Sequence, residues 1–580
     1  MPVQVEYFPL VGGLDVVTPY FNLRPGQMIE CANYECLPEG GYRRIDGYML
    51  YDGSESAATV PGEGAIRGVW VFKSEVYAIR DQASEGGLFK ATASGWQAVD
   101  LGQSVDFKEG SLDFIEGELV TGGTGGATAT IERVIFSGGT NGAGTSFGRL
   151  VISGVVGSFV DGETLSTASG AAAKADGAEF NNSLPKGGRY VFDNNNFFGQ
   201  DGLERMYGAG GAGDAFEFDG TVFAPIRVAT ENIYPEFVVA HKQHLILGFA
   251  IGSLQTSSPG EPLVFDPLLG AAEISVGDTI TSLKSLPGGV LAIGCQDSVQ
   301  MLYGNDSESW EVQQFTDHGV KKYSFAEVGG NTLALDDRGV QNIRATQAYG
   351  DFEAISQSRP INPLILGARE NLQPTSSVVS KTKSQYRIFF GKEGYYFSYS
   401  GDRLTGITPV QYAHPVLMSA VGENENGKEI IFFGSEDGQV FQANSGYHFY
   451  ETNIVAFFRI AFIFERQPTR RKQYRKAVLD IQTEGDSAQL IVKPDFDFRG
   501  GDVPNTPFCE LQTTVTGGGT WDFSAWDDFN WSAPFYAAED VPLAGVGRNM
   551  SLSFTSLGVE SGSHTIFSAA IHYSMRRLDR

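Results

Sequence analysis

Three tryptophans recur every five residues in the segment TWDFSAWDDFNWSAP, at Trp521, Trp526 and Trp531, with aspartates between them. Indole rings beside carboxylates suit a sugar-binding surface, where aromatic faces stack on sugar rings. The same residues also suit a structural corner, in which the indoles bury apolar area between a sheet and a loop while the acids stay in water. We favour the corner and keep glycan contact as the alternative.

A second candidate is the basic run RQPTRRKQYRK, which spans residues 466–476 and contains Arg470, Arg471 and Arg475. A run of this kind is most often a solvated face. In a chain of formal net charge −27 it could instead dock on an acidic neighbouring subunit, or contact phosphate directly. We list these arginines as candidate contacts with another subunit or an adaptor protein.

The remaining patterns give little support to catalysis. His241 and His244 in HKQH lack a third metal donor, and PDFDFRGGD lacks the glutamate that closes a calcium loop. The glycine-rich GGTGGATA is not followed by GK[ST], so a phosphate loop is disfavoured. No Ser/His/Asp order with a nucleophile elbow is apparent. We therefore expect no enzyme activity, no metal and no cofactor.

Composition sets the limits within which these elements are arranged. At 580 residues the chain exceeds the roughly 250–300 residues at which one core stops growing, so we expect several domains. The 73 glycines exceed the usual ~7% and indicate many tight turns. Four scattered cysteines and the lack of a signal-peptide pattern indicate folding in a reducing compartment. The net charge of −27 argues against wrapping nucleic acid through phosphate neutralisation.

A strand-turn-strand unit recurs along the chain at intervals of roughly forty to fifty-five residues. Its copies begin at Val76, Arg189, His244, Val290, Thr332, Tyr386 and Ile430. Such repeats of strands predict an all-β fold with a β-propeller of about five to seven blades, because radial packing covers both faces of each small sheet. A series of β-sandwiches is the alternative, and it would lack the long period.

The interval from Val76 to Arg189 is twice the period and contains two segments of similar sequence. FIEGELVTGGTGGATA from Phe114 and FVDGETLSTASGAAAKA from Phe159 share an aromatic, an acid, a glycine and a small-residue tail. This duplication predicts an inserted β module over residues 108–180. After Ala477, alternating strands predict an antiparallel β domain. The expected division is 1–60 (N-terminal arm and first strands), 61–107 (first blade), 108–180 (insert), 181–465 (remaining blades) and 466–580 (C-terminal β domain).

The first fifty-three residues resemble the opening of many tailed-phage structural proteins. The resemblance rests on a GGL start, Pro25-Gly26, Asn33-Tyr34-Glu35, Gly40-Gly41-Tyr42-Arg43-Arg44, Gly47-Tyr48 and Asp52-Gly53. The hairpin repeats and the tryptophan-bearing domain that ends in HYSMRRLDR resemble the tail nozzle, or tail tubular protein B class, of short-tailed bacteriophages. The resemblance is good for the N-terminal arm and the extreme C-terminus and loose elsewhere, and the insert is not a constant part of it.

This resemblance implies a virion component that is made in the bacterial cytoplasm and assembles as a homohexameric ring beneath the portal and adaptor proteins, near tail fibers or spikes. Double-stranded DNA would pass through its channel during ejection. Because a ring needs head-to-tail contacts, we expect the arm to lie on a neighbour, with Tyr42, Tyr48 and Tyr51 as anchors and Arg43 and Arg44 forking to carboxylates. The alternative is that GGYRRIDGY closes the propeller within one chain.

The acidic charge gains a mechanical meaning in such a ring, because a conduit must not hold its cargo. Each Lys or Arg contact with phosphate adds to salt-dependent retention, so we expect an acidic or neutral bore. Two other functions stay open for the chain: a receptor-binding tail component, and a glycan-cleaving one.

Overall fold

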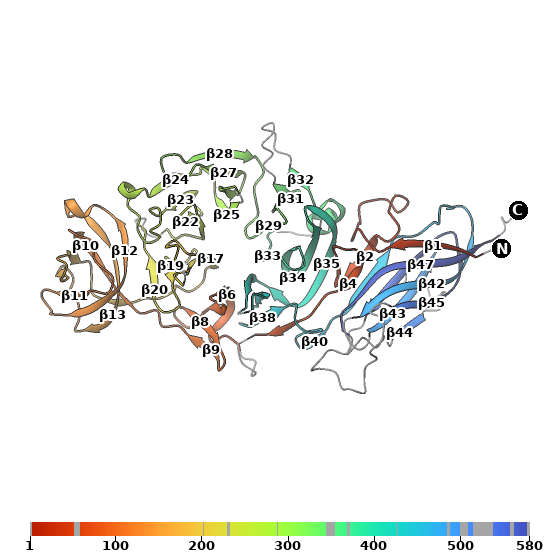
Figure 1. Ribbon diagram of the computed structural model, residues 1–580, viewed down its shortest axis with the longest axis horizontal. Helices are drawn as coiled ribbons and strands as arrows, with labels where there is room; N and C mark the ends of the chain where they lie inside the picture. The colour runs from red at the N-terminus through yellow and green to blue at the C-terminus, as the bar shows by residue number, and fades with distance from the viewer. Residues whose placement is uncertain are drawn as a thin grey trace.

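The computed structural model describes residues 3–51, 59–200, 202–228, 233–286, 288–343, 354–367, 372–424, 426–483, 488–498, 509–513, 537–556 and 562–576. Within these ranges strands dominate, and helix is confined to η1 (Asn141–Ala143), η2 (Pro267–Leu269), η3 (Arg359–Ile361) and α1 (Asn362–Leu366). None of these helices is long and apolar enough to cross a membrane. The molecule is elongated, with a small barrel at one end, a propeller in the middle and a sandwich carrying both termini at the other end (Figure 1).

The propeller has seven blades, within the range of five to seven that the repeats predicted, and their strands pair antiparallel except at one place in the seventh blade. The first three are β6 (Glu63–Phe72), β7 (Glu75–Asp81), β8 (Gly86–Thr92) and β9 (Gly95–Ala98); β17 (Val191–Asn195), β18 (Arg205–Ala209), β19 (Ala215–Phe218) and β20 (Phe223–Ile226); and β21 (Phe237–His241), β22 (His244–Phe249), β23 (Ser253–Thr256) and β24 (Ala272–Ser275). The next two are β25 (Ile280–Leu286), β26 (Val290–Cys295), β27 (Val299–Tyr303) and β28 (Glu311–Thr316); and β29 (Ala326–Val328), β30 (Asn331–Asp336), β31 (Gly339–Ile343) and β32 (Ala354–Ser356).

The last two blades depart from four simple strands. The sixth contains β33 (Ser376–Ser380), β34 (Gln385–Ser400) and β35 (Arg403–Val416). A straight strand as long as β34 would separate its ends by about 50 Å, yet the Tyr399 amide donates to the Ser384 carbonyl at 2.9 Å. β34 therefore doubles back on itself and supplies two strands of the blade, as expected from the hairpin in its sequence.

The seventh blade is completed by the N-terminal part of the chain. Its strands β36 (Met418–Glu423), β37 (Glu429–Gly434) and β38 (Val440–Ala443) are followed in the sheet by β5 (Tyr48–Leu50), then by β39 (His448–Phe449) and β40 (Thr452–Asn453). β5 pairs antiparallel with β38, with Tyr48 opposite Ala443. A strand from the start of the chain thus closes the ring that the later blades form.

Hydrophobic clusters lie between neighbouring blades all around the ring. Each is built from the inward-facing residues of two adjacent sheets, for example Phe72, Tyr77 and Phe218 between the first and second blades. Other clusters join the seventh blade to the first, the second to the third, and onward to the fifth. The largest cluster continues from the last three blades into the sandwich. Face-to-face burial between blades is the arrangement that lets such small sheets fold.

The insert is a closed barrel made from β10 (Gln103–Gly110), β11 (Leu119–Gly122), β12 (Thr128–Gly138), β13 (Ser146–Val156), β14 (Thr164–Ser166) and β15 (Ala172–Ala175), with β16 (Phe180–Asn181) beside β10. It closes because β10 pairs with both β13 and β15. The two segments of similar sequence meet where β11 pairs with β14. The Glu163 carboxylate accepts hydrogen bonds from the Thr124 and Gly125 amides at 2.9 and 3.1 Å, so amides of GGTGGATA are already occupied.

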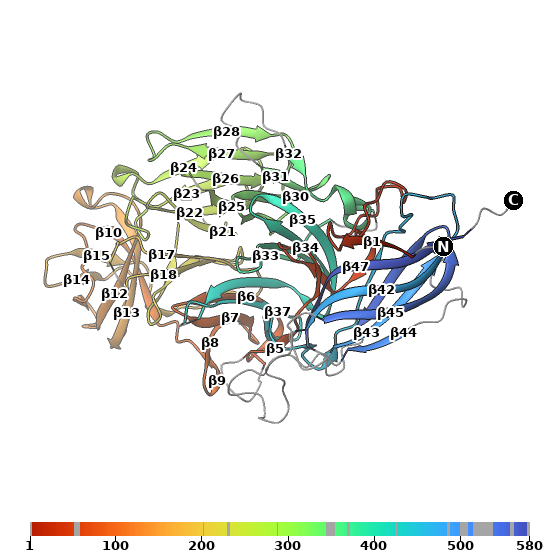
Figure 2. The same ribbon diagram turned by 45° about the vertical axis from the view of Figure 1, so that its right-hand side comes forward.

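The sandwich combines both ends of the chain (Figure 2). One sheet contains β1 (Gln4–Pro9), β3 (Tyr34–Cys36), β4 (Tyr42–Arg44), β47 (His564–Met575), β42 (Lys472–Thr483) and β45 (Ala537–Gly547). The other contains β2 (Met28–Ala32), β41 (Ala456–Ile460), β46 (Met550–Ser556), β43 (Ala488–Phe496) and β44 (Cys509–Thr513). Their inner faces share one core, which includes Phe458, Phe554 and Ile571.

These boundaries differ from the expected division in three places. The sandwich already includes β41, at residues expected to belong to the blades. The barrel begins at Gln103 and ends at Asn181, so it takes in a strand that had been assigned to the first blade. Four strands that were assigned to a separate N-terminal arm belong to the sandwich, because β1, β3 and β4 pair within its first sheet and β2 pairs with β41 in its second. The alternation of a strand marks which face is buried, but it does not reveal a partner more than 400 residues away.

Candidate functional site

The parts of the N-terminal pattern that the structure describes converge on the joint between the sandwich and the last two blades. Leu14 donates its amide to Ile407 in β35. Asn33 links the two parts, since its amide group donates to the Val455 carbonyl at 2.8 Å and its oxygen accepts from the Gln411 amide at 2.7 Å. The Tyr42 hydroxyl donates to the Gly26 carbonyl at 2.6 Å, so two separate parts of the pattern contact each other.

Close packing explains two of the glycines in the pattern. A Cβ on Gly26, whose φ is +92°, would lie 2.0 Å from the Pro9 carbonyl oxygen. A Cβ on Gly47 would lie 2.0 Å from the carbonyl oxygen of His448. Neither position has room for any side chain, so these glycines permit the chain to pass from the sandwich into the propeller.

A charged cluster at this joint holds the arginines of the pattern. Arg43 pairs with Glu35 at 2.8 Å and with Asp46 at 2.6 Å, and Lys383 from the sixth blade reaches both carboxylates at 2.8 Å. Burial alone would raise the pKa of Glu35 and of Asp46, but Lys383 and Arg43 hold both pKa values below their usual range. Sequence reasoning missed Lys383 because it lies more than 330 positions from its partners.

The five pattern residues assigned to contact with a neighbour have partners within their own chain. Tyr42, Arg44 and Tyr48 have no exposed surface, and Arg43 is buried. Tyr48 stacks on Phe449 with ring centroids 4.9 Å apart, and its hydroxyl lies 2.9 Å from His414 Nδ1. The partly buried Tyr51 packs against Phe432 in the seventh blade.

This placement requires a correction. In this conformation Tyr42, Arg43, Arg44 and Tyr48 have no surface to offer a second subunit, and the segment instead follows the alternative in which it closes the propeller within one chain. The expectation was wrong because glycines and paired arginines are equally suited to a tight internal joint, where buried carboxylates satisfy the guanidinium groups.

The basic run is divided by the alternation of β42. Arg471 and Arg475 are exposed, and Arg470 is partly buried. Lys472 points inward and pairs with the equally buried Glu465 at 2.9 Å. Lys476 pairs with Asp540 at 2.8 Å on the neighbouring strand. Of the three arginines named as candidate contacts, Arg471 and Arg475 therefore remain open to a partner.

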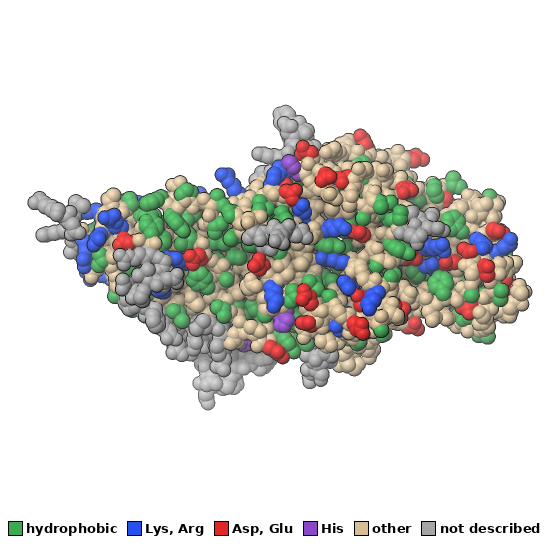
Figure 3. Space-filling model, turned by 180° about the vertical axis from the view of Figure 1, so that it is seen from behind, with side chains coloured by type: hydrophobic (Ala, Val, Ile, Leu, Met, Phe, Trp, Pro, Cys, Tyr) green, Lys and Arg blue, Asp and Glu red, His purple; other side chains and the backbone are tan. Residues whose placement is uncertain are grey.

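An exposed apolar surface lies on the same sheet. Val3, Val5 and Tyr7 are 47%, 53% and 66% exposed. Val5 and Tyr7 lie on β1, an edge strand that pairs with β47 on one side only. We call these three residues the β1 surface. Their spacing of two residues in MPVQVEYFP is the pattern of an amphipathic strand. Hydrophobic and basic side chains are both visible at the sandwich end of the molecule (Figure 3).

The other candidates do not form a site in the described part of the chain. His241 and His244 face each other across a two-residue turn, but they bind Ser285 and the Ser257 carbonyl, and no group of three metal-binding side chains occurs among the described residues. Trp521, Trp526 and Trp531 lie outside the described residues, so neither interpretation of them is decided.

Comparison with known proteins finds similarity in structure only. No protein-family model matches the chain, and no curated protein matches its sequence. Virginiamycin B lyase from Staphylococcus aureus is 7% identical, with 58% of this chain and 98% of that chain covered and a TM-score of 0.32. The WD40 propeller domain of Doa1 is 10% identical, with 69% and 97% covered and a TM-score of 0.36. The WD40 domain of Toxoplasma gondii coronin is 9% identical, with 71% and 87% covered and a TM-score of 0.36. The chain is thus similar to β-propellers of unrelated functions.

Proposed function

We propose that this chain is a structural subunit of the tail of a short-tailed bacteriophage. Six copies form a nozzle ring beneath the portal and adaptor proteins, and the genome leaves through its channel. The observation that carries the proposal is the N-terminal pattern. Its described parts meet at one joint, which gives a physical reason for Gly26, Tyr42, Arg43 and Gly47 to occur together.

The β1 surface is the contact that we assign to the ring. A strand edge leaves backbone donors and acceptors unpaired, and three exposed apolar side chains beside it favour burial against another chain. A ring needs a heterologous contact, so this edge meets a different surface of the next copy. Arg471 and Arg475 lie on the same sheet and suit an acidic partner, either the next copy or an adaptor protein.

One observation favours receptor binding as a second candidate function. The barrel lies at the opposite end of the molecule from the sandwich (Figure 1). It exposes Ile115, Leu119 and Val156, each more than half accessible. A barrel that projects from a tail is well placed to contact a host surface. Binding of the excised barrel to whole host cells would support this function.

The mass and end-on image of the purified protein test the main proposal. Native mass spectrometry should give a hexamer, and electron microscopy should show a ring with a hole wide enough for duplex DNA. If adaptor protein is required for closure, the ring should appear when the two are mixed. A monomer under all of these conditions, and in the native particle, would rule out the nozzle.

A further inference from the structure

The propeller surrounds a partly open cavity at its centre, lined by residues from all seven blades. Its volume is about 170 Å³. That volume is slightly larger than the roughly 150 Å³ cavity known to hold benzene in another protein. The cavity is therefore large enough for a small organic molecule. It lies away from the joint and from the β1 surface.

One wall of the cavity carries a cation without a counter-ion. The guanidinium of Arg189 lies 3.4 Å from the ring centroid of Tyr323 and makes no ion pair or hydrogen bond with any described residue. Burial lowers the pKa of Arg189 to about 10, so the side chain is still a cation at neutral pH. The lining residues include no Asp, Glu or Lys. Arg189 is partly buried, and an anion in the cavity would offset the partial desolvation of its charge.

Some hydroxyl groups of the cavity lining have hydrogen-bond partners, and one does not. Ser376 and Ser419 bond to each other at 2.6 Å, and Ser377 donates to the Tyr323 carbonyl at 2.7 Å. The Oγ of Ser282 is buried and has no hydrogen-bond partner in the described structure. An unpaired buried hydroxyl costs about 1–3 kcal/mol. This Oγ has almost no accessible surface and lies beside Gly294 of the neighbouring strand, so it does not face the cavity, and Arg189 is the polar group that a ligand would meet.

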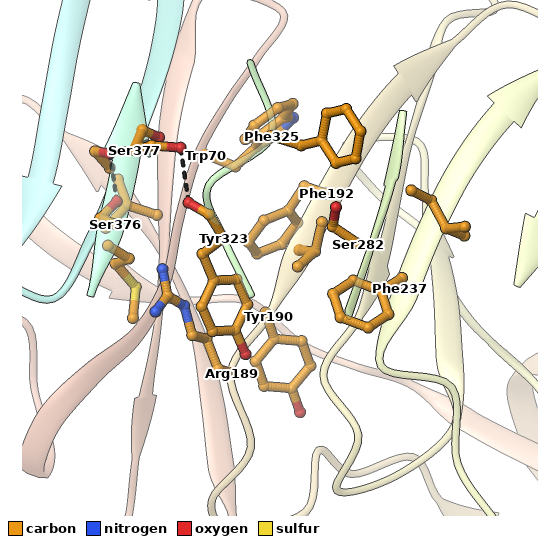
Figure 4. Close-up of a pocket in the computed structure, with 15 residues that line it drawn as sticks. Trp70, Arg189, Tyr190, Phe192, Phe237, Ser282, Tyr323, Phe325, Ser376 and Ser377 are labelled. Carbon is orange, nitrogen blue, oxygen red and sulfur yellow. Dashed lines mark hydrogen bonds between the residues drawn. The ribbon is translucent and has the colours of Figure 1, made fainter. Parts of the chain in front are cut away.

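The opposite wall is aromatic. Phe192 and Phe237 lie across the cavity from Arg189 and the serine pair (Figure 4). Trp70 stacks on Phe192 with ring centroids 5.6 Å apart. Tyr323, whose backbone φ is +62°, holds its ring beneath the guanidinium. A bulky residue in this backbone region is unusual and marks a position fixed by its surroundings.

We infer that the central cavity of the propeller binds a small organic monocarboxylate with a flat apolar body. The carboxylate pairs with Arg189, and the apolar body lies against Phe192 and Phe237. An aromatic body matches these rings, because offset or edge contacts between rings add to the burial of area. The inference does not depend on whether the chain forms a tail ring.

Isothermal titration calorimetry on the full chain tests this site, with benzoate as the probe. Benzoate should bind saturably at one site per chain. Benzamide, which has the same shape without the charge, should bind at least tenfold more weakly, and inorganic phosphate should not bind measurably. Arg189→Gln should weaken benzoate binding at least tenfold. Lys186→Gln, an exposed charge three residues before Arg189, is the matched control and should bind like the unaltered chain.

Different outcomes test the charge of the ligand, its apolar body and the existence of the site. Equal binding of benzoate and benzamide by the unaltered chain would overturn the role of Arg189, even if Arg189→Gln fails to fold. Phosphate binding as tight as that of benzoate would contradict the inference that the ligand has an organic, apolar body. Absence of any saturable benzoate binding, or unchanged binding by a folded Arg189→Gln protein, would overturn the site.

Discussion

At the scale of single residues, Arg43 shows how a charge suited to binding can serve the fold instead. Its guanidinium joins two carboxylates, and the Glu35 partner is fully buried. Arg43→Met leaves Lys383 to neutralise Glu35 and Asp46, beside the hydrogen bonds from Gln385 to Glu35 and from Ser563 to Asp46. Removing one partner from a buried ion-pair network costs about 3–5 kcal/mol. We expect the midpoint of thermal unfolding to fall by several degrees.

The matched control for this prediction is Arg471→Met, at the exposed residue that directly precedes β42. Its effect on stability should stay within about 0.5 kcal/mol, as is usual for surface positions. Differential scanning calorimetry of both variants makes the comparison. If Arg43→Met unfolds like the unaltered protein but separates the assembled ring, the arginine contacts a neighbour after all.

Glu465 gives a prediction about pH. Burial raises the pKa of Glu465 from 4.5 to about 7, although Lys472 opposes the shift. The folded chain therefore holds this proton to a higher pH than the unfolded chain does, and stability falls as the pH rises from about 4.5 to 7. Lys472 is also held by the carbonyls of Phe464, Gln467 and Arg548, so it keeps partners in either state.

Glu465→Gln removes this titration. We expect the variant to match the unaltered protein near pH 4.5 and to be more stable by about 3 kcal/mol at pH 8, from about 1.36 kcal/mol per pKa unit. Urea unfolding between pH 4.5 and 8 measures the difference, with the exposed Glu39→Gln as the control. A stability difference between the two proteins that does not change with pH would contradict the buried titration.

At the scale of elements, local patterns and distant pairings differ in how far the sequence reveals them. The seven hairpins were predictable because each pairs strands separated by a short turn, as in VLAIGCQDSVQMLYG, which forms β26 and β27. The closure by β5 was one of two open alternatives, because Tyr48 finds its partner Ala443 almost 400 residues later. The charged joint and the central cavity need residues from several blades, and no local spacing brings those together.

The barrel should fold when it is excised from the chain. It has its own core, which includes Val105, Ile131 and Leu165, and its sheet closes on itself. Its ends are adjacent, since the Asn182 amide donates to the Gly102 carbonyl at 2.9 Å. Residues 102–182 should therefore show a cooperative thermal transition by circular dichroism.

A half-barrel fragment, residues 102–157, is the control for this prediction. It keeps one of the two segments of similar sequence but loses β14 and β15, so β11 and β10 keep unpaired edges. It should remain unfolded or aggregate. Cooperative folding of the half fragment would show that each of these segments is an independent unit, which the pairing of β11 with β14 opposes.

The β1 surface can be tested without altering the core of the sandwich. The double variant Val5→Ser and Tyr7→Ser removes two exposed apolar side chains and should leave the unfolding midpoint within a few degrees. Ring formation, measured by native mass spectrometry, should weaken at least tenfold. Leu268→Ser, at a 76% exposed position on the propeller, is the control. Equal assembly of both variants would remove β1 from the contact.

At the scale of the whole molecule, charge decides how a ring would treat its cargo. Each chain carries a formal net charge of −27. Much of the positive charge in the described structure is held in ion pairs, such as Arg149 with Asp106 and Arg205 with Glu217. A bore built from such chains offers few cations to phosphate, and retention grows with the number of such contacts. The same surplus of acid helps to keep the assembled protein soluble.

We therefore expect the purified ring not to hold duplex DNA. Fluorescence anisotropy of a labelled duplex in about 20 mM salt, where phosphate contacts are strongest, should show no binding at micromolar protein. If weak binding appears, the Arg471→Glu and Arg475→Glu double variant tests its location. Loss of binding in that variant assigns it to the exposed arginines at the start of β42 rather than to the bore. Micromolar binding that persists in the variant and falls steeply with salt would place cations along the channel. A ring that grips its DNA in this way could not serve as the conduit proposed for it.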